Sequence, residues 1–174
     1  MSDTTTAPAA ADAATQAALE RLNTVIDRLI APDGCPWDST QTPESLTEYV
    51  IEECHELVDA IRSGKTADMV EELGDVAFLI LMIGKLMARA GGPSLADALE
   101  VEAAKMVRRH PHVFSDTTYE NQSEQLKDWD RIKREEKAAA DAEGPKGTYD
   151  SLPRGLPPLT KAYRIHSKAD RVGF

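Results

Sequence analysis

Two acidic motifs in one continuous stretch, Val50 to Leu81, constrain this chain more than any other feature. They are Glu53-x-x-Glu56 and Glu72-x-x-Asp75. On a helix, the i, i+3 spacing places both side chains of a pair on one face, about 5–6 Å apart at Cβ. Like charges placed in this way destabilise an isolated helix. Two such pairs, on helices joined by a short turn, therefore indicate that something positive binds between them.

The apolar pattern around these acids predicts two helices that form an antiparallel hairpin. Glu53 falls on the apolar stripe of the first helix, where a carboxylate is costly unless it is paired, protonated or bound to metal. Asp75 directly precedes a continuous apolar run at 76–83, which predicts that the second helix is buried on all faces there. Gly64 lies between the helices and suits a helix C-cap. The stripe of the first helix consists of Leu46, Val50, Leu57 and Ile61.

The hairpin is expected to gather four carboxylates, whose charge two divalent cations would neutralise. Ligation by oxygen alone favours Mg²⁺ or Mn²⁺ over zinc. The predicted metal ligands are Glu53, Glu56, Glu72 and Asp75. The alternative is that these acids are solvated residues on the surface of a helical bundle.

The charge and the apolar content of the chain limit its partners. The net charge of −10 argues against a nucleic acid polymer, which would need a basic face. It is compatible with a phosphate ligand, because bound metal ions reverse the local field. The longest apolar run, about eight residues, is too short to span a membrane. The N-terminus has no signal-peptide pattern and the two cysteines form no close-spaced motif, so we expect a reduced, cytoplasmic protein.

The chain divides into a tail, a helical domain and a second tail, and the predicted fold class is all-α. Residues 1–15 are rich in Ala and Thr and are predicted to be disordered. Residues 16–140 form the domain, and residues 141–174 form a linker and a C-terminal tail with a short helix at 160–172. A short extended loop is predicted at 110–114. Within the domain, helices are predicted at 16–30, 43–63, 66–90, 95–109 and 121–140.

The cations that suit an anionic ligand gather on two of these helices. Lys105 and Arg109 are i, i+4 near the end of one helix, and Trp129 and Lys133 have the same spacing on the last one. A functional interpretation is a phosphate grip beside a flat surface on which a base stacks. The alternatives are that Lys105 and Arg109 complement the helix dipole, and that Trp129 packs in the core.

Several motifs together carry a family resemblance. Glu52-Glu53-x-x-Glu56 followed by Glu72-x-x-Asp75 resembles the signature of the all-α nucleoside triphosphate pyrophosphohydrolases. Four flanking segments make the chain similar to one branch of them, the MazG proteins, over roughly residues 18–174. These segments are CPWD at 35–38, RRHPHVF at 108–114, WDRIKREE at 129–136 and LPRGLPPL at 152–159.

The resemblance implies a helical bundle that is completed by dimerisation, as a homodimer or a dimer of dimers. It implies two Mg²⁺ or Mn²⁺ ions held by the four acids. It also implies cleavage of a nucleoside triphosphate (NTP or dNTP) between its α- and β-phosphates, to a monophosphate and pyrophosphate, with non-canonical or damaged nucleotides among the substrates. In the family, residues matching Lys105, Arg109 and Lys133 contact phosphates, and the one matching Trp129 lies by the nucleoside. Longer MazG proteins carry two such domains, whereas this chain contains one acidic unit.

For the chemistry we expect a two-metal displacement in which Glu53, or alternatively Glu52, orients or deprotonates the attacking water. Two other functions stay open. One is a relative with a narrow substrate, such as dUTP or phosphoribosyl-ATP, against which the CPWD and HPHVF segments argue. The other is a non-catalytic helical regulator, against which the intact set of four acids argues. The sequence does not set the base and sugar preference or the role of residues 152–174.

Overall fold

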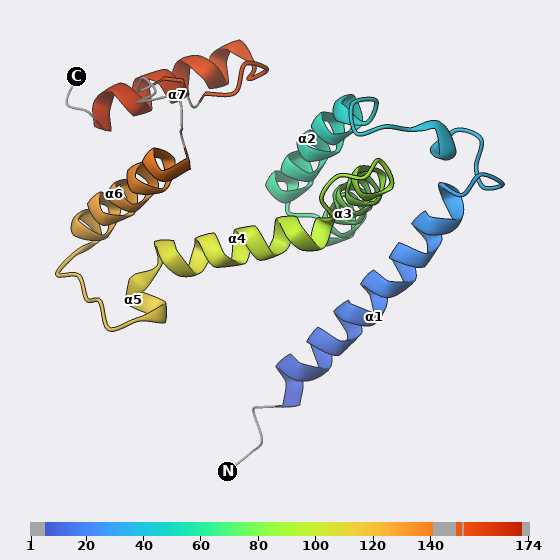
Figure 1. The fold of residues 1–174 in the computed structure, drawn as a ribbon, viewed down its shortest axis with the longest axis horizontal. Helices are drawn as coiled ribbons and strands as arrows, with labels where there is room; N and C mark the ends of the chain where they lie inside the picture. Colours follow the sequence, from blue (N-terminus) through green and yellow to red (C-terminus); the bar gives the residue numbers. More distant parts are fainter. Residues whose placement is uncertain (1–5, 141–148, 151, 172–174) are drawn as a thin grey trace. The chain divides into compact units, whose positions relative to one another are not determined.

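The computed structural model describes residues 6–140, 149–150 and 152–171, and over these ranges it contains helices and no strand (Figure 1). The all-α prediction is therefore confirmed. The chain divides into two units, residues 1–103 and 104–174. Its helices are α1 (Thr6–Leu29), α2 (Thr47–Ser63), α3 (Thr66–Arg89), α4 (Leu95–Arg109), α5 (Pro111–Phe114), α6 (Gln122–Ala140) and α7 (Pro158–Arg171), with one 3₁₀ turn, η1 (Asp38–Thr40).

The core of the first unit forms where α3 packs against both α2 and α1 (Figure 1). Polar contacts also connect α3 with the region of α1. Lys85 donates a hydrogen bond to Asp27 at 2.7 Å, and Arg89 donates one to the carbonyl oxygen of Ile30 at 2.8 Å. The buried core residues are Ile26, Ile30, Leu46, Leu79, Leu81, Met82 and Leu86.

The hairpin of α2 and α3 forms as predicted, and Gly64 ends α2 in the left-handed conformation, with φ of 71°. The start of α2 differs, because the helix begins at Thr47 rather than at Pro43. Thr42 and Ser45 instead bond each other's backbone, each N–H donating to the other's hydroxyl oxygen, at 3.0 and 3.2 Å. Thr42 and Ser45 therefore close a turn that precedes the helix.

The first helix begins earlier than the sequence pattern indicated. We predicted that residues 1–15 are disordered, but α1 begins at Thr6, so the prediction is wrong for 6–15. This segment is rich in alanine, which has the highest helix propensity of all residues. These residues extend a helix whose later part packs in the core, so their helix propensity is sufficient and they need no buried contacts of their own. Residues 1–5 lie outside the described residues.

Helices α2 and α3 expose an apolar stripe, of which the sequence pattern had assigned Ile61 and Ile80 to the core. The core side of α2 continues to Ala60 rather than to Ile61, and Ile80 interrupts the expected burial of α3 on all faces. The reason is that α3 buries only the side that packs against α1 and α2. The apolar stripe comprises six side chains with 40–68% exposure: Ile51, Val58 and Ile61 of α2, and Val70, Leu73 and Ile80 of α3.

The beginning of α4 packs closely on α3. A Cβ added to Gly84 would lie 2.6 Å from the Cβ of Leu95, so the glycine is what permits this approach. Ser94 and Asp97 cap the N-terminus of α4. The Asp97 carboxylate accepts hydrogen bonds from the backbone N–H and the hydroxyl of Ser94, at 2.7 and 2.6 Å.

The second unit contains the end of α4 followed by α5, α6 and α7. Residues 111–114 form one helical turn, so the predicted extended loop is wrong. Pro111 occupies its first position, where proline's fixed φ suits a helix. Helices α6 and α7 form close to their predicted ranges, and the predicted linker at 141–148 lies outside the described residues. None of the helices in the described ranges combines the length and the apolarity needed to cross a membrane.

Candidate active site

Three of the four predicted metal ligands converge across the hairpin. Glu53 and Glu56 lie one turn apart on α2, and Glu72 lies on α3. Each offers a carboxylate oxygen, and these three oxygens lie within 4.8 Å of one another. Glu53 and Glu72 are partly buried, whereas Glu56 is exposed. The α2–α3 hairpin therefore gathers carboxylates from both helices, as the acidic motifs predicted.

The electrostatics of this cluster are those of a site without a counter-ion of its own. Burial, followed by the charges of Asp75, Glu56 and Glu52, raises the pKa of Glu53. Burial and the neighbouring carboxylates, with Glu56 first among them, likewise raise the pKa of Glu72. All the charged neighbours that shift these two pKa values are carboxylates, so the repulsion has no offset from a basic side chain.

Asp75 and Glu52 lie at the edge of this cluster. Asp75 is outside the group of three oxygens, although it follows Glu72 by one turn on α3 and its charge acts on Glu53. Glu52 is exposed and contributes the smallest of the charge effects on Glu53. The donor set fits a hard divalent cation such as Mg²⁺, because it offers several carboxylate oxygens and neither sulfur nor imidazole.

In the second unit, Arg109 and Trp129 come together around Glu136. The Oε2 of Glu136 accepts hydrogen bonds from Nε and Nη2 of Arg109, at 2.9 and 2.7 Å. The guanidinium carbon of Arg109 lies 5.9 Å from the centroid of the Trp129 ring. The hydrogen bond from Arg109, aided by one from Arg108, keeps the pKa of Glu136 below its usual range in spite of partial burial. Lys105 and Lys133 lie one helical turn from Arg109 and Trp129, on α4 and α6.

Trp129 is held by a histidine that the sequence reasoning did not assign to this site. The rings of His110 and Trp129 meet edge to face, with centroids 4.7 Å apart. The Nδ1 of His110 is in turn 2.7 Å from the carbonyl oxygen of Met106. Glu136 was also missed, although a signal was available: it follows Trp129 by seven residues, or two helical turns, and so shares its face of α6.

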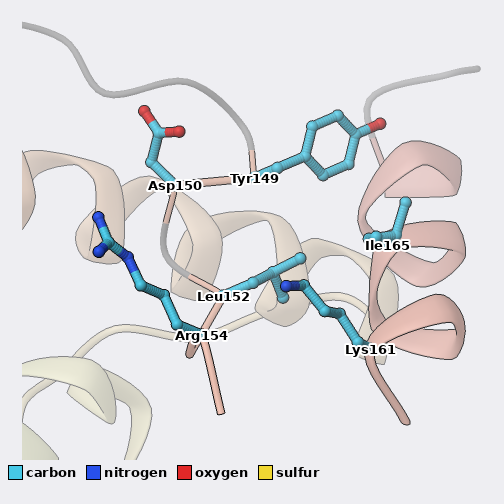
Figure 2. A pocket seen from close by; sticks show the side chains of 6 residues that line it. All are labelled: Tyr149, Asp150, Leu152, Arg154, Lys161 and Ile165. Carbon is cyan, nitrogen blue, oxygen red and sulfur yellow. The ribbon is translucent and has the colours of Figure 1, made fainter. Parts of the chain in front are cut away.

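A separate pocket of about 400 Å³ lies in the C-terminal part of the chain (Figure 2). None of the predicted site residues lines it. Figure 2 shows Tyr149 and Ile165 on one side of this pocket and Arg154 on another. The lining is completed by Asp150, Leu152 and Lys161.

Comparison with known proteins relates the hairpin to a known domain family. Residues 41–114, which include the whole α2–α3 hairpin, match the model of the MazG nucleotide pyrophosphohydrolase domain. The nucleoside triphosphate pyrophosphohydrolase of Escherichia coli is 38% identical over 157 residues, which are 90% of this chain and 59% of that protein. The nucleoside triphosphate pyrophosphohydrolase/pyrophosphatase MazG of Thermotoga maritima is 37% identical over 89% of this chain and 58% of that protein.

A solved structure is similar as well. The crystal structure of a mazG-related protein from Thermotoga maritima superposes with a TM-score of 0.57 at 29% sequence identity, and covers 66% of this chain and 98% of that one. An all-helical chain with an oxygen-donor acid cluster in a helical hairpin is thus similar in sequence and in fold to MazG proteins. Residues 41–114 carry the similarity to the MazG nucleotide pyrophosphohydrolase domain. It spans less than two thirds of the length of the two curated relatives named above.

Proposed function

We propose that this chain is a Mg²⁺-dependent nucleoside triphosphate pyrophosphohydrolase, which cuts NTP or dNTP between the α- and β-phosphates. The observation that carries the proposal is the convergence of Glu53, Glu56 and Glu72 within 4.8 Å. Two curated relatives bear the name of this activity, which supports the same reaction here. Clearance of non-canonical or damaged nucleotides is the expected role, and a cytoplasmic location stays a prediction.

The four acids would hold two Mg²⁺ or Mn²⁺ ions, with Asp75 completing the set. When bound, such ions stabilise charge on phosphate oxygens and lower the pKa of water. Glu53 is our candidate for orienting or deprotonating the water, because it is partly buried and offers a carboxylate oxygen within 4.8 Å of those of Glu56 and Glu72. Glu52 is the alternative. The water adds to phosphorus, the bond to the bridging oxygen breaks, and pyrophosphate leaves with that oxygen.

The second unit would bind the nucleotide itself. Arg109 is the strongest candidate for a phosphate contact, because its guanidinium is oriented and only 18% exposed. Trp129, partly buried beside it, presents a flat ring to a base or sugar. Lys105 and Lys133 would add positive charge from one helical turn away. The alternatives are that Trp129 packs in the core and that Arg109 only complements the helix dipole.

A homodimer, or a dimer of dimers, is proposed from the apolar stripe. The hairpin exposes six large apolar side chains, three on each helix, and exposed apolar surface of this kind marks sites of association. Ile61→Glu and Ile80→Glu are expected to lower the molecular mass in sedimentation from that of an oligomer to that of a monomer. Leu99→Glu on α4, a site of 60% exposure outside the stripe, is the matched control. A wild-type chain that sediments as a monomer would contradict the proposal.

The reaction is tested by pyrophosphate release from a panel of canonical and damaged NTPs and dNTPs, in Mg²⁺, in Mn²⁺ and in excess chelator. Glu56→Gln and Asp75→Asn are expected to lower turnover at least a hundredfold, and Glu48→Gln, an exposed acid on the same helix, is expected to leave it unchanged. Turnover of dUTP or phosphoribosyl-ATP alone would favour a narrow-substrate relative. Absence of turnover with every nucleotide and both cations would favour a non-catalytic regulator.

A further inference from the structure

Glu136 holds the guanidinium of Arg109 by one edge. Its Oε2 bonds Nε and Nη2 of Arg109, while its Oε1 accepts a hydrogen bond from Nε of Arg108 at 3.1 Å. The side chains of Glu136 and Arg109 are 21% and 18% exposed, so water competes poorly for these bonds. Two N–H groups of Arg109 thus donate to one carboxylate oxygen, and hydrogen bonds between such charged groups are strong. The guanidinium of Arg109 is therefore fixed in one orientation.

The orientation leaves a second edge of the same guanidinium available. A guanidinium carries five N–H donors in one rigid plane. Glu136 takes the edge formed by Nε and Nη2, so both N–H groups of Nη1 and the second one of Nη2 remain. One N–H of Nη1 and the remaining N–H of Nη2 form the fork that matches two oxygens of a phosphate group. Trp129 lies beside the guanidinium and limits the directions in which it can turn.

We propose that Glu136 is a positioning residue, which presents the free edge of Arg109 to a phosphate of the nucleotide; this inference rests on the function proposed above. A free arginine side chain loses rotamer freedom when it binds a ligand, and that loss weakens binding. Because Glu136 restricts Arg109 in advance, the nucleotide binds with a smaller loss. Glu136 itself touches no phosphate, since its charge would repel one.

Charge alone predicts the opposite effect, which makes the proposal easy to separate from a purely electrostatic one. Glu136 is negative and close to a proposed phosphate contact. If it did nothing more, its removal would strengthen the binding of an anionic nucleotide. If it positions Arg109, its removal weakens binding in spite of the favourable change in charge. The sign of the change in affinity therefore distinguishes the two roles.

The experiment measures the affinity of the full chain, in Mg²⁺, for a deoxynucleoside triphosphate with an imido bridge between its α- and β-phosphates. Glu136→Gln is expected to weaken binding about threefold to tenfold, and Glu136→Asp, which keeps the charge with a shorter reach, by less. Glu135→Gln is the matched control. It removes the same charge from the adjacent residue, which pairs with Arg131 at 2.8 Å, and it is expected to leave the affinity unchanged or slightly increased.

A structural readout accompanies the affinity. In wild type, the Nε–H signal of Arg109 in a ¹H–¹⁵N spectrum is expected to be protected from exchange with water, and Glu136→Gln is expected to remove that protection. Unchanged or tighter binding by Glu136→Gln would overturn the inference, as would failure of the wild-type chain to bind the imido compound. If wild type binds it but hydrolyses no nucleotide, the proposed reaction fails and the effect of Glu136→Gln on affinity still decides the role of Glu136.

Discussion

Glu53 on α2 and Glu72 on α3 bring carboxylate oxygens within 4.8 Å of each other across the hairpin, although both are partly buried. Repulsion between them works against the packing of α2 on α3, so a bound divalent cation should stabilise the fold. At a concentration of 100 times Kd, we expect stabilisation by about 2.7 kcal/mol. That corresponds to a rise in Tm of about 5–10 °C for a chain of this size.

Thermal unfolding in Mg²⁺ and in chelator measures this rise. Glu72→Gln should abolish most of it, because it removes a ligand, while Glu48→Gln on the same hairpin should preserve it. Equal Tm values for wild type in Mg²⁺, in Mn²⁺ and in chelator would contradict the assignment of the acid cluster as a metal site.

The same two carboxylates predict how the stability of the metal-free chain depends on pH. Burial and the neighbouring acids raise the pKa of Glu53 and of Glu72 above the value of 4.5 for an unperturbed glutamate. Between that value and the raised pKa, the folded state binds more protons than the unfolded state. Stability therefore falls as pH rises through this window, and it increases as pH is lowered toward 4.5.

Denaturant unfolding in chelator at pH 7 and at pH 5 measures this effect. The gain in stability of wild type on acidification should be reduced in Glu53→Gln, which no longer titrates at this position. An equal gain in wild type and Glu53→Gln would show that other groups control the pH dependence. Three other acids have lowered pKa values, so the stability that they contribute is lost only when the pH falls below this window. They are Asp97, Asp128 and Glu136.

The sequence predicted the helical hairpin and its acids because both depend on local spacing. The i, i+3 pairs and the helix C-cap at Gly64 each depend on residues within four positions of one another. What the pattern did not predict depends on which neighbour each face meets. Ile61 and Ile80 carry the right residue type for a core, yet their side chains are 57% and 49% exposed.

The candidate nucleotide site shows the same limit. Spacing along each helix paired Lys105 with Arg109 and Trp129 with Lys133, but no local rule joins residue 109 to residue 136. The hydrogen bonds between these two residues link the end of α4 to α6, across α5 and a loop. The helical turn at Pro111–Phe114 was itself predicted to be extended, so the path between the two helices was not available from the sequence.

The absence of a side chain at Gly84 is what allows α4 to pack closely on α3. Gly84→Ala would place a Cβ 2.6 Å from the Cβ of Leu95, so α4 must shift, and we expect a loss of stability of about 1–3 kcal/mol. Gly74→Ala in the same helix is the matched control, because a Cβ there meets nothing within 4 Å. It should instead gain up to about 1 kcal/mol from helix propensity. Urea unfolding of both variants measures the difference, and equal stabilities would contradict the close contact.

Replacement of Trp129 is expected to lower the affinity for the nucleotide. Replacement of an aromatic that stacks on a base costs about 1–3 kcal/mol, so Trp129→Ala should raise KM about fivefold to a hundredfold with a smaller change in kcat. Trp37 provides the control: it packs edge to face on Tyr49 at 5.6 Å in the first unit, and Trp37→Ala should leave KM nearly unchanged. Fluorescence of Trp37→Phe, in which Trp129 is the sole tryptophan, should change on addition of nucleotide. If Trp129→Ala leaves KM at the wild-type value, the nucleoside does not stack on this ring.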